Sequence, residues 1–164
     1  MRDLVAALVA LALLAAALSL ATTLHFWRRR RERAHESERA AGRTIVAEIP
    51  VGDELRLFTE DEHCFYYGQA SIDKDDIAAV RVLINGAPIA AAVSSRYAGN
   101  ERQATSFEDR PEGIARDRWD VAIEAPDRTV LVECGAIRER ISQELARAVF
   151  EAVKRDLEHR NARP

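Results

Sequence analysis

The chain has 164 residues, enough for one domain of ordinary size. Its net charge of −3 hides an uneven distribution. Residues 1–33 carry six arginines and two acidic side chains, a net +4, which leaves 18 basic and 25 acidic side chains, a net −7, for the rest. Proteins bind nucleic acid largely through phosphate neutralisation by Lys and Arg. The acidic balance therefore excludes nucleic acid as an expected partner.

The first expected element is a membrane anchor. Residues 4–24 carry no charge and consist of eight Leu, eight Ala, two Val and three hydroxyl side chains. A helix of this length measures roughly 31 Å, close to the hydrocarbon thickness of about 30 Å. Trp27 follows where an interfacial aromatic residue belongs. Residues 1–27 are therefore predicted to form a transmembrane anchor that contacts the lipid bilayer through residues 4–27.

A run of arginines follows the apolar segment and consists of Arg28, Arg29, Arg30, Arg31 and Arg33. Basic residues that flank a span stay on the cytoplasmic side. The expected topology is a single-pass protein of the inner cell membrane, with its N-terminus outside and its C-terminal domain in the cytoplasm. Two alternatives stay open. Ser19-Leu20-Ala21 has the small residues of a signal-peptide cleavage site, and small residues at four-residue spacing in the anchor are compatible with a homo-oligomer.

The soluble part is predicted to be mainly β. Residues 28–43 are charged and lack large apolar side chains, which indicates a basic juxtamembrane linker or a short helical continuation of the anchor. From residue 44 to the C-terminus the pattern is that of one domain, and Asn85-Gly86 marks a two-residue hairpin because both positions need φ > 0. Residues 72–76 indicate an acidic turn. The seven predicted strands are 44–49, 54–58, 63–68, 77–84, 87–93, 119–125 and 129–134.

A helix of about 20 residues is predicted to close this domain of residues 44–164. Its apolar stripe recurs every four residues and consists of Ile141, Leu145, Val149, Val153 and Leu157. Before the last two strands, residues 94–118 form a long polar loop without periodicity, which in a compact domain is usually functional or disordered. Its candidate partner-binding residues are Arg96, Tyr97, Arg102, Phe107 and Arg110.

This order of elements resembles the pleckstrin-homology-like (PH-like) superfold over residues 44–158. Asp75-Asp76-Ile77 before a strand, the hairpin of residues 119–134 and Gly135 before the closing helix are similar to bacterial membrane-associated members. The resemblance implies a seven-stranded, partly open barrel or sandwich closed by the C-terminal amphipathic helix, and a binding or scaffolding role. Lipid-binding members use a basic loop between the first two strands. Here that loop, Pro50-Val51-Gly52-Asp53, is acidic, so phosphoinositide binding is not carried over.

Enzymatic chemistry is not expected. The sequence has no Gly-x-Ser-x-Gly, His-Glu-x-x-His or Gly-rich phosphate loop. His63 and Cys64 carry metal-ligand atoms, but neighbours in a strand point to opposite faces, and the acidic residues 60–62 disfavour a nucleophilic thiolate. Cys64 and Cys134 form no Cys-x-x-Cys pair and are expected to be small apolar side chains in a reducing compartment. We therefore expect no catalytic residue, no cofactor and no metal.

The function that these observations favour is a membrane-anchored cytoplasmic interaction or scaffold module with a protein partner. It would recruit that partner through an open sheet edge or through residues 94–118. Trp119 alternates with apolar neighbours and is expected in the core rather than on a ligand surface. Two alternatives are an anionic-lipid sensor at the inner leaflet, acting through residues 28–33, and an extracytoplasmic domain of an envelope or secretion assembly.

Overall fold

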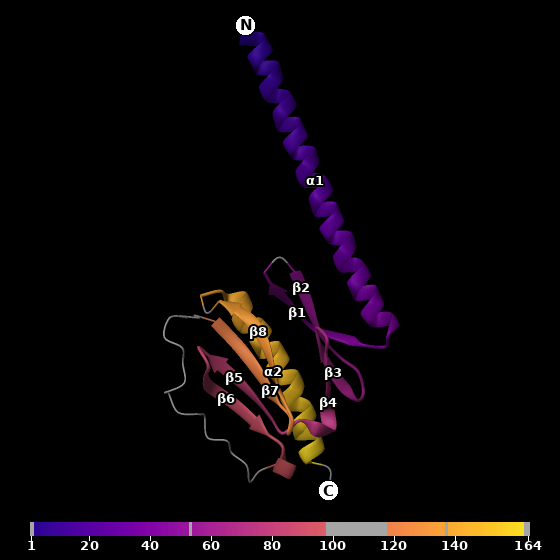
Figure 1. Ribbon diagram of the computed structural model, residues 1–164, viewed down its shortest axis with the longest axis vertical. Helices are drawn as coiled ribbons and strands as arrows, with labels where there is room; N and C mark the ends of the chain where they lie inside the picture. Colours follow the sequence, from indigo (N-terminus) through magenta and orange to yellow (C-terminus); the bar gives the residue numbers. More distant parts are fainter. Residues whose placement is uncertain (1, 53, 98–117, 137, 163–164) are drawn as a thin grey trace. The chain divides into compact units, whose positions relative to one another are not determined.

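The computed structural model describes residues 2–52, 54–97, 118–136 and 138–162 (Figure 1). The chain divides into two compact units, Met1–Ala41 and Gly42–Pro164, and each is described by itself.

The first unit is a single helix, α1 (Arg2–Ala40). Its apolar part is built from Ala and Leu, which favour helix, and no Gly or Pro precedes Gly42. The segment predicted as a linker is helical as far as Ala40. The helix ends where the Ala41 N–H donates to the Ser37 carbonyl at 3.1 Å and Gly42 adopts a φ of 76°, the left-handed conformation common at helix C-termini.

In the described part of the second unit, eight strands form two antiparallel sheets of four strands each. The first sheet has the order β1-β2-β3-β4 and the second has the order β6-β5-β7-β8. The strands are β1 (Thr44–Val51), β2 (Glu54–Glu60), β3 (Cys64–Tyr67), β4 (Ala70–Asp73), β5 (Ala79–Ile84), β6 (Ala87–Val93), β7 (Arg118–Glu124) and β8 (Thr129–Ala136).

The described residues contain one strand more than the seven expected. The additional strand is β4, which overlaps the acidic turn predicted at residues 72–76. Ile72 pairs with Phe65 of β3 and is buried, so this short segment contributes to the core in spite of its acidic neighbours. Gly68, with a φ of 59°, allows the tight β3–β4 turn. Only Lys74–Asp76 remains as a turn, the short 3-10 helix η1.

The predicted hairpin between β5 and β6 is confirmed. Asn85 and Gly86 have φ values of 53° and 79°, as a two-residue turn of this kind requires. Ile84 and Ala87 pair directly on either side of the turn.

The long polar stretch after β6 has a topological role that the sequence did not reveal. Both β6 and β7 pair with β5 in antiparallel fashion, so they run parallel to each other on its two sides. A connection between parallel strands must lead from the end of one strand back to the start of the other, and it needs a dozen or more residues. Residues 94–117 are therefore a crossover connection. Most of it, residues 98–117, lies outside the described residues.

A β-bulge interrupts the β7–β8 hairpin. Trp119 pairs with Gly135 and Asp120 pairs with Glu133, so Cys134 is the additional residue on β8. Gly135 has a φ of 113°, and a Cβ atom at this position would lie 2.5 Å from Ser142 Oγ. The glycine therefore allows the strand to end in close contact with the helix that follows.

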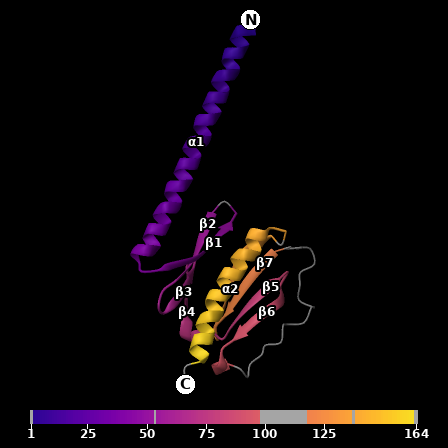
Figure 2. The ribbon, with the colours of Figure 1, turned by 180° about the vertical axis from the view of Figure 1, so that it is seen from behind.

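The closing helix is confirmed as α2 (Arg140–Asn161), which packs on β1 and on the second sheet (Figure 2). Val149, Val153 and Leu157 are buried, as their spacing predicted. Ile141 is 67% exposed, so its assignment to the buried stripe was wrong. Ser142 instead faces inward against Gly135, which turns the preceding side chain toward solvent.

The core lies between the two sheets and α2. Phe58 and Phe65 stack at a centroid distance of 5.6 Å, and Trp119 packs partly buried against the core as predicted. Strands β1 and β8 touch, yet no ladder joins them in the described chain, so the sheets do not close into a barrel. A mainly β domain with a C-terminal helix is confirmed, and its assignment to the PH-like superfold stays a prediction. Fully buried core residues include Ile49, Ile77, Val80, Val121, Ile123 and Val132.

Candidate functional site

The first candidate site is the apolar half of α1. Among residues 11–20, the leucine side chains are 60% to 67% exposed. Thr22 Oγ1 donates to the carbonyls of Leu18 (3.0 Å) and Ser19 (2.8 Å), and Thr23 Oγ1 donates to that of Ser19 (2.8 Å). These hydroxyl groups are satisfied within the helix, as the interior of a bilayer requires. The helix is long and apolar enough to cross a membrane.

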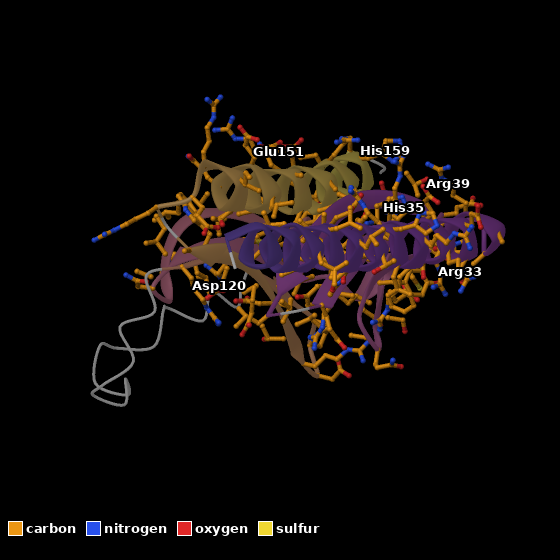
Figure 3. All side chains as sticks on the ribbon, turned by 90° about the horizontal axis from the view of Figure 1, so that it is seen from above. Arg33, His35, Arg39, Asp120, Glu151 and His159 are labelled. Carbon is orange, nitrogen blue, oxygen red and sulfur yellow. The ribbon has the colours of Figure 1, made fainter. Side chains whose placement is uncertain are left out.

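The second candidate site is the basic collar, which we define as Arg28, Arg29, Arg30, Arg31 and Arg33 of α1. All five side chains are exposed, and Trp27 just before them is 45% exposed. Arg28 Nε pairs with Glu32 Oε1 at 3.2 Å, one helical turn further on. Such an exposed pair contributes little to stability. Figure 3 shows Arg33 of the collar and Arg39 further along the same helix. The collar thus presents five exposed guanidinium groups within six consecutive residues.

The candidate loop is described only at its two ends. Arg96 and Tyr97 lie in a short 3-10 helix, η2 (Ser95–Tyr97), and Arg96 is exposed. Arg102, Phe107 and Arg110 lie outside the described residues.

The beginning of the loop is fastened to the end of α2. The carboxamide of Asn161 donates to the carbonyl of Val93 at 3.2 Å and accepts from the N–H of Ser95 at 2.8 Å. A side-chain amide thus takes the place of a neighbouring strand at this end of β6. The position of Arg96 is therefore set by the packed domain.

A polar network, which we call the turn network, joins β2, β3 and η1 through Glu60, Asp61, Tyr66 and Lys74. Asp61 Oδ1 accepts hydrogen bonds from the N–H groups of His63 (2.8 Å) and Cys64 (2.7 Å). Its Oδ2 accepts from the Tyr66 hydroxyl at 2.7 Å. These bonds, that of Tyr66 first, lower the pKa of Asp61 to about 2, and the same Tyr66–Asp61 bond raises the pKa of Tyr66 to about 12.

Lys74 completes the turn network. Its Nζ donates to Glu60 Oε2 at 3.1 Å and to the carbonyl of Asp61 at 2.7 Å, and its side chain is only 12% exposed. The same ammonium lies 4.6 Å from the centroid of the Phe65 ring and 4.0 Å from Asp156 Oδ1 of α2. The lysine therefore ties the turns of the first sheet to the closing helix. The Lys74 ammonium is therefore used in contacts within the domain.

A second charged cluster lies on the β7–β8 hairpin. Asp120 is buried and Glu133 is paired opposite it, so two carboxylates meet across the strands. Arg118 lies between them, with Nε at 2.8 Å from Asp120 Oδ1 and an Nη at 2.8 Å from Glu133 Oε1. A buried carboxylate needs such a partner.

The Cys134 thiol lies buried on the same hairpin. Burial, with a contribution from the charge of Asp120, raises the pKa of this thiol to about 12.

Sequence reasoning missed both clusters. Lys74 follows Glu60 by 14 positions, and Arg118 precedes Glu133 by 15, so neither pair is a local motif. For the second cluster the register of the β7–β8 hairpin would have been the signal, because it places Asp120 opposite Glu133.

His63 and Cys64, which carry metal-ligand atoms, take part in the turn between β2 and β3 through their backbone N–H groups. Cys64 begins β3 and His63 precedes it, and both backbone N–H groups bind the same Asp61 carboxylate. In the described ranges, no three or more His, Cys, Asp or Glu side chains are grouped so that they could hold a metal ion.

Comparisons of the chain with protein-family models, with curated proteins and with solved structures found no match.

Proposed function

We propose that this chain is a membrane-anchored interaction module without enzymatic activity, whose β domain lies in the cytoplasm and recruits a protein partner. The observation that carries the proposal is the direct succession of a membrane-length helix and a compact β domain. Only residues 41–43 separate the end of α1 from β1. A chain built in this way keeps a small folded domain at a membrane.

The titratable groups with shifted pKa values support a structural rather than a catalytic use of the domain. The Tyr66 hydroxyl donates to Asp61, and Asp61 also accepts from backbone N–H groups of the turn. The Cys134 thiol is buried, and its raised pKa disfavours the reactive thiolate. These pKa shifts follow from hydrogen bonds within the fold and, for Cys134, from burial, which is what we expect of a stable binding platform.

The orientation follows from the basic collar. Arginines next to a span are retained on the cytoplasmic side, and in the sequence the collar follows the apolar part of α1 and precedes the β domain. A reporter fused after Pro164 tests this orientation. We expect fluorescence from a C-terminal green fluorescent protein and no activity from a C-terminal alkaline phosphatase. The opposite result would place the domain outside the cytoplasm and contradict the proposal.

Residues 94–118 remain the proposed docking loop, but the crossover topology rules out their deletion as a test, because the sheet cannot form without this connection. Site-specific photo-crosslinking in intact cells keeps the chain complete. The probe replaces Arg96, which is exposed at the start of the loop, and the control probe replaces Glu151 on the exposed side of α2 (Figure 3). We expect a discrete protein adduct from position 96 only. Equal adducts from both positions, or none at position 96, would contradict docking through the loop.

A further inference from the structure

The basic collar occupies a short length of α1. Residues 28–33 carry five arginines and one glutamate, a net +4, and the helix then carries acidic residues at Glu36 and Glu38 with a single arginine at Arg39. At about 1.5 Å per residue the collar is roughly 9 Å tall. The polar layer on each side of a bilayer is about 5–8 Å thick, from the difference between the total and the hydrocarbon thickness. The positive charge thus matches the headgroup layer in height and starts directly after the apolar segment.

The arginines also surround the helix. Successive helical residues are rotated by roughly 100°, so the five side chains leave the axis at roughly 0°, 100°, 200°, 300° and 140°. All five are exposed. A protein groove or a partner helix binds one face of a helix and would leave the other faces without a role. Lipid headgroups surround a spanning helix on every side, so a ring of charge fits a lipid partner.

We propose that the basic collar binds the phosphates of anionic phospholipids and keeps a shell of them around α1. Guanidinium groups suit this role because they stay charged and present several N–H donors to phosphate oxygens. The inference rests on the membrane-anchor part of the proposed function. It does not depend on the protein partner or on which side of the membrane the domain lies.

The test uses the complete chain in vesicles whose two leaflets have the same composition, 20% phosphatidylglycerol in phosphatidylcholine. Trp27, at the edge of the collar, reports on the lipids around it when either lipid is brominated on its acyl chains. A Trp119→Phe background removes the other tryptophan. The ratio of quenching by the two brominated lipids gives the preference for the anionic lipid. We expect a clear preference at low salt that disappears at 1 M salt, where the Debye length is about 3 Å.

Two double variants separate a lipid shell from a one-sided partner. Arg28→Gln/Arg31→Gln and Arg29→Gln/Arg30→Gln remove the same charge from opposite sides of the helix. We expect each to reduce the preference by the same factor, on the order of fivefold per arginine where all of them contact the headgroup layer. Arg138→Gln/Arg147→Gln on exposed positions of the β domain is the charge-matched control and should leave the preference unchanged.

Three results would overturn the inference. One is equal quenching by both brominated lipids in the parent chain. Another is a loss confined to one of the two double variants, which would indicate a partner bound to one face of α1. The third is failure of the chain to sediment with the vesicles, which would also remove the anchor itself. A wrong orientation in the reporter experiment, in contrast, would leave the lipid preference intact, so the two proposals fail separately.

Discussion

Replacing Gly135 by alanine tests the contact between the end of β8 and the start of α2. The backbone at this position has a φ of 113°, which costs a residue with a Cβ roughly 1–3 kcal/mol. The new methyl group would lie 2.5 Å from Ser142 Oγ and 3.3 Å from Ser142 Cβ. Ser142 is buried, so it cannot move into solvent. Overpacking of this kind costs roughly another 1–3 kcal/mol.

We therefore expect Gly135→Ala to lower the free energy of unfolding by about 2–6 kcal/mol, out of about 5–15 kcal/mol for a typical domain. The assay is urea unfolding of the complete chain in neutral detergent micelles, followed by the emission of Trp119 in a Trp27→Phe background. Gly68→Ala is the matched control, because Gly68 also has a positive φ, 59°, with nothing within 4 Å of a built Cβ. It should lose only the backbone term, about 1–2 kcal/mol.

A double variant isolates the steric term. Ser142→Ala removes the Oγ atom that the new methyl group would strike, together with the hydrogen bond from Ser142 Oγ to Glu139 Oε2 at 3.2 Å. Gly135→Ala/Ser142→Ala should therefore lose less stability than the sum of the two single changes. If the losses are additive, and Gly135→Ala costs no more than Gly68→Ala, the close packing of β8 on α2 is wrong.

Two further predictions concern ionisable groups. The pKa of Asp61 falls from 3.8 to about 2, with the hydrogen bond from Tyr66 as the first cause, so the contribution of this carboxylate to stability is complete above pH 4 and is lost as the pH falls through about 2. Tyr66→Phe should therefore be less stable than the parent chain at pH 7, and urea titrations should show this difference in the free energy of unfolding disappearing between pH 4 and pH 2. A difference that does not depend on pH would refute this role of Asp61. Since the pKa of Cys134 is about 12, iodoacetamide at pH 8 should alkylate the partly exposed Cys64 and spare Cys134 until urea is added. Peptide mass spectrometry reads out both sites, and equal alkylation of the folded chain would contradict the buried position of Cys134.

Local signals in the sequence were sufficient for several elements. Asn85-Gly86 specifies its hairpin because few other residue pairs tolerate two successive positive φ values. The four-residue spacing of Val149, Val153 and Leu157 identified the buried face of α2. The membrane-length helix could be predicted by counting the consecutive uncharged residues in the apolar part of α1.

Other features depended on contacts distant in sequence. The strand at residues 70–73 was missed because a four-residue strand with one buried side chain, Ile72, carries too little pattern to stand out from its acidic neighbours. The strand order β6-β5-β7 could not be predicted because nothing local specifies which side of β5 is taken by β7. Residues 94–118 were therefore predicted to be a functional loop because the segment is long and polar. The need to connect two parallel strands is a structural reason for the same length.

The candidate sites divide in the same way. The basic collar lies within six consecutive residues and could be identified directly from the sequence. The environment of Arg118, in contrast, needs the register that brings Asp120 and Glu133 together. A cross-strand pair of carboxylates is visible only once the strands have been aligned.

The position of β7 between β5 and β8 also sets the order in which this domain is completed during synthesis. The hairpin of β5 and β6 leaves the ribosome early, but the other edge of β5 stays unpaired until residues 118–124 have emerged. Pairing across so long an intervening segment is slow, because the chain loses much conformational freedom before the contact forms. The nascent protein therefore exposes the unpaired edge of β5 for several seconds, at about 5–20 residues synthesised per second. That interval is when chaperones would have to shield it, and a ribosome that stalls before residue 118 would leave an aggregation-prone stub.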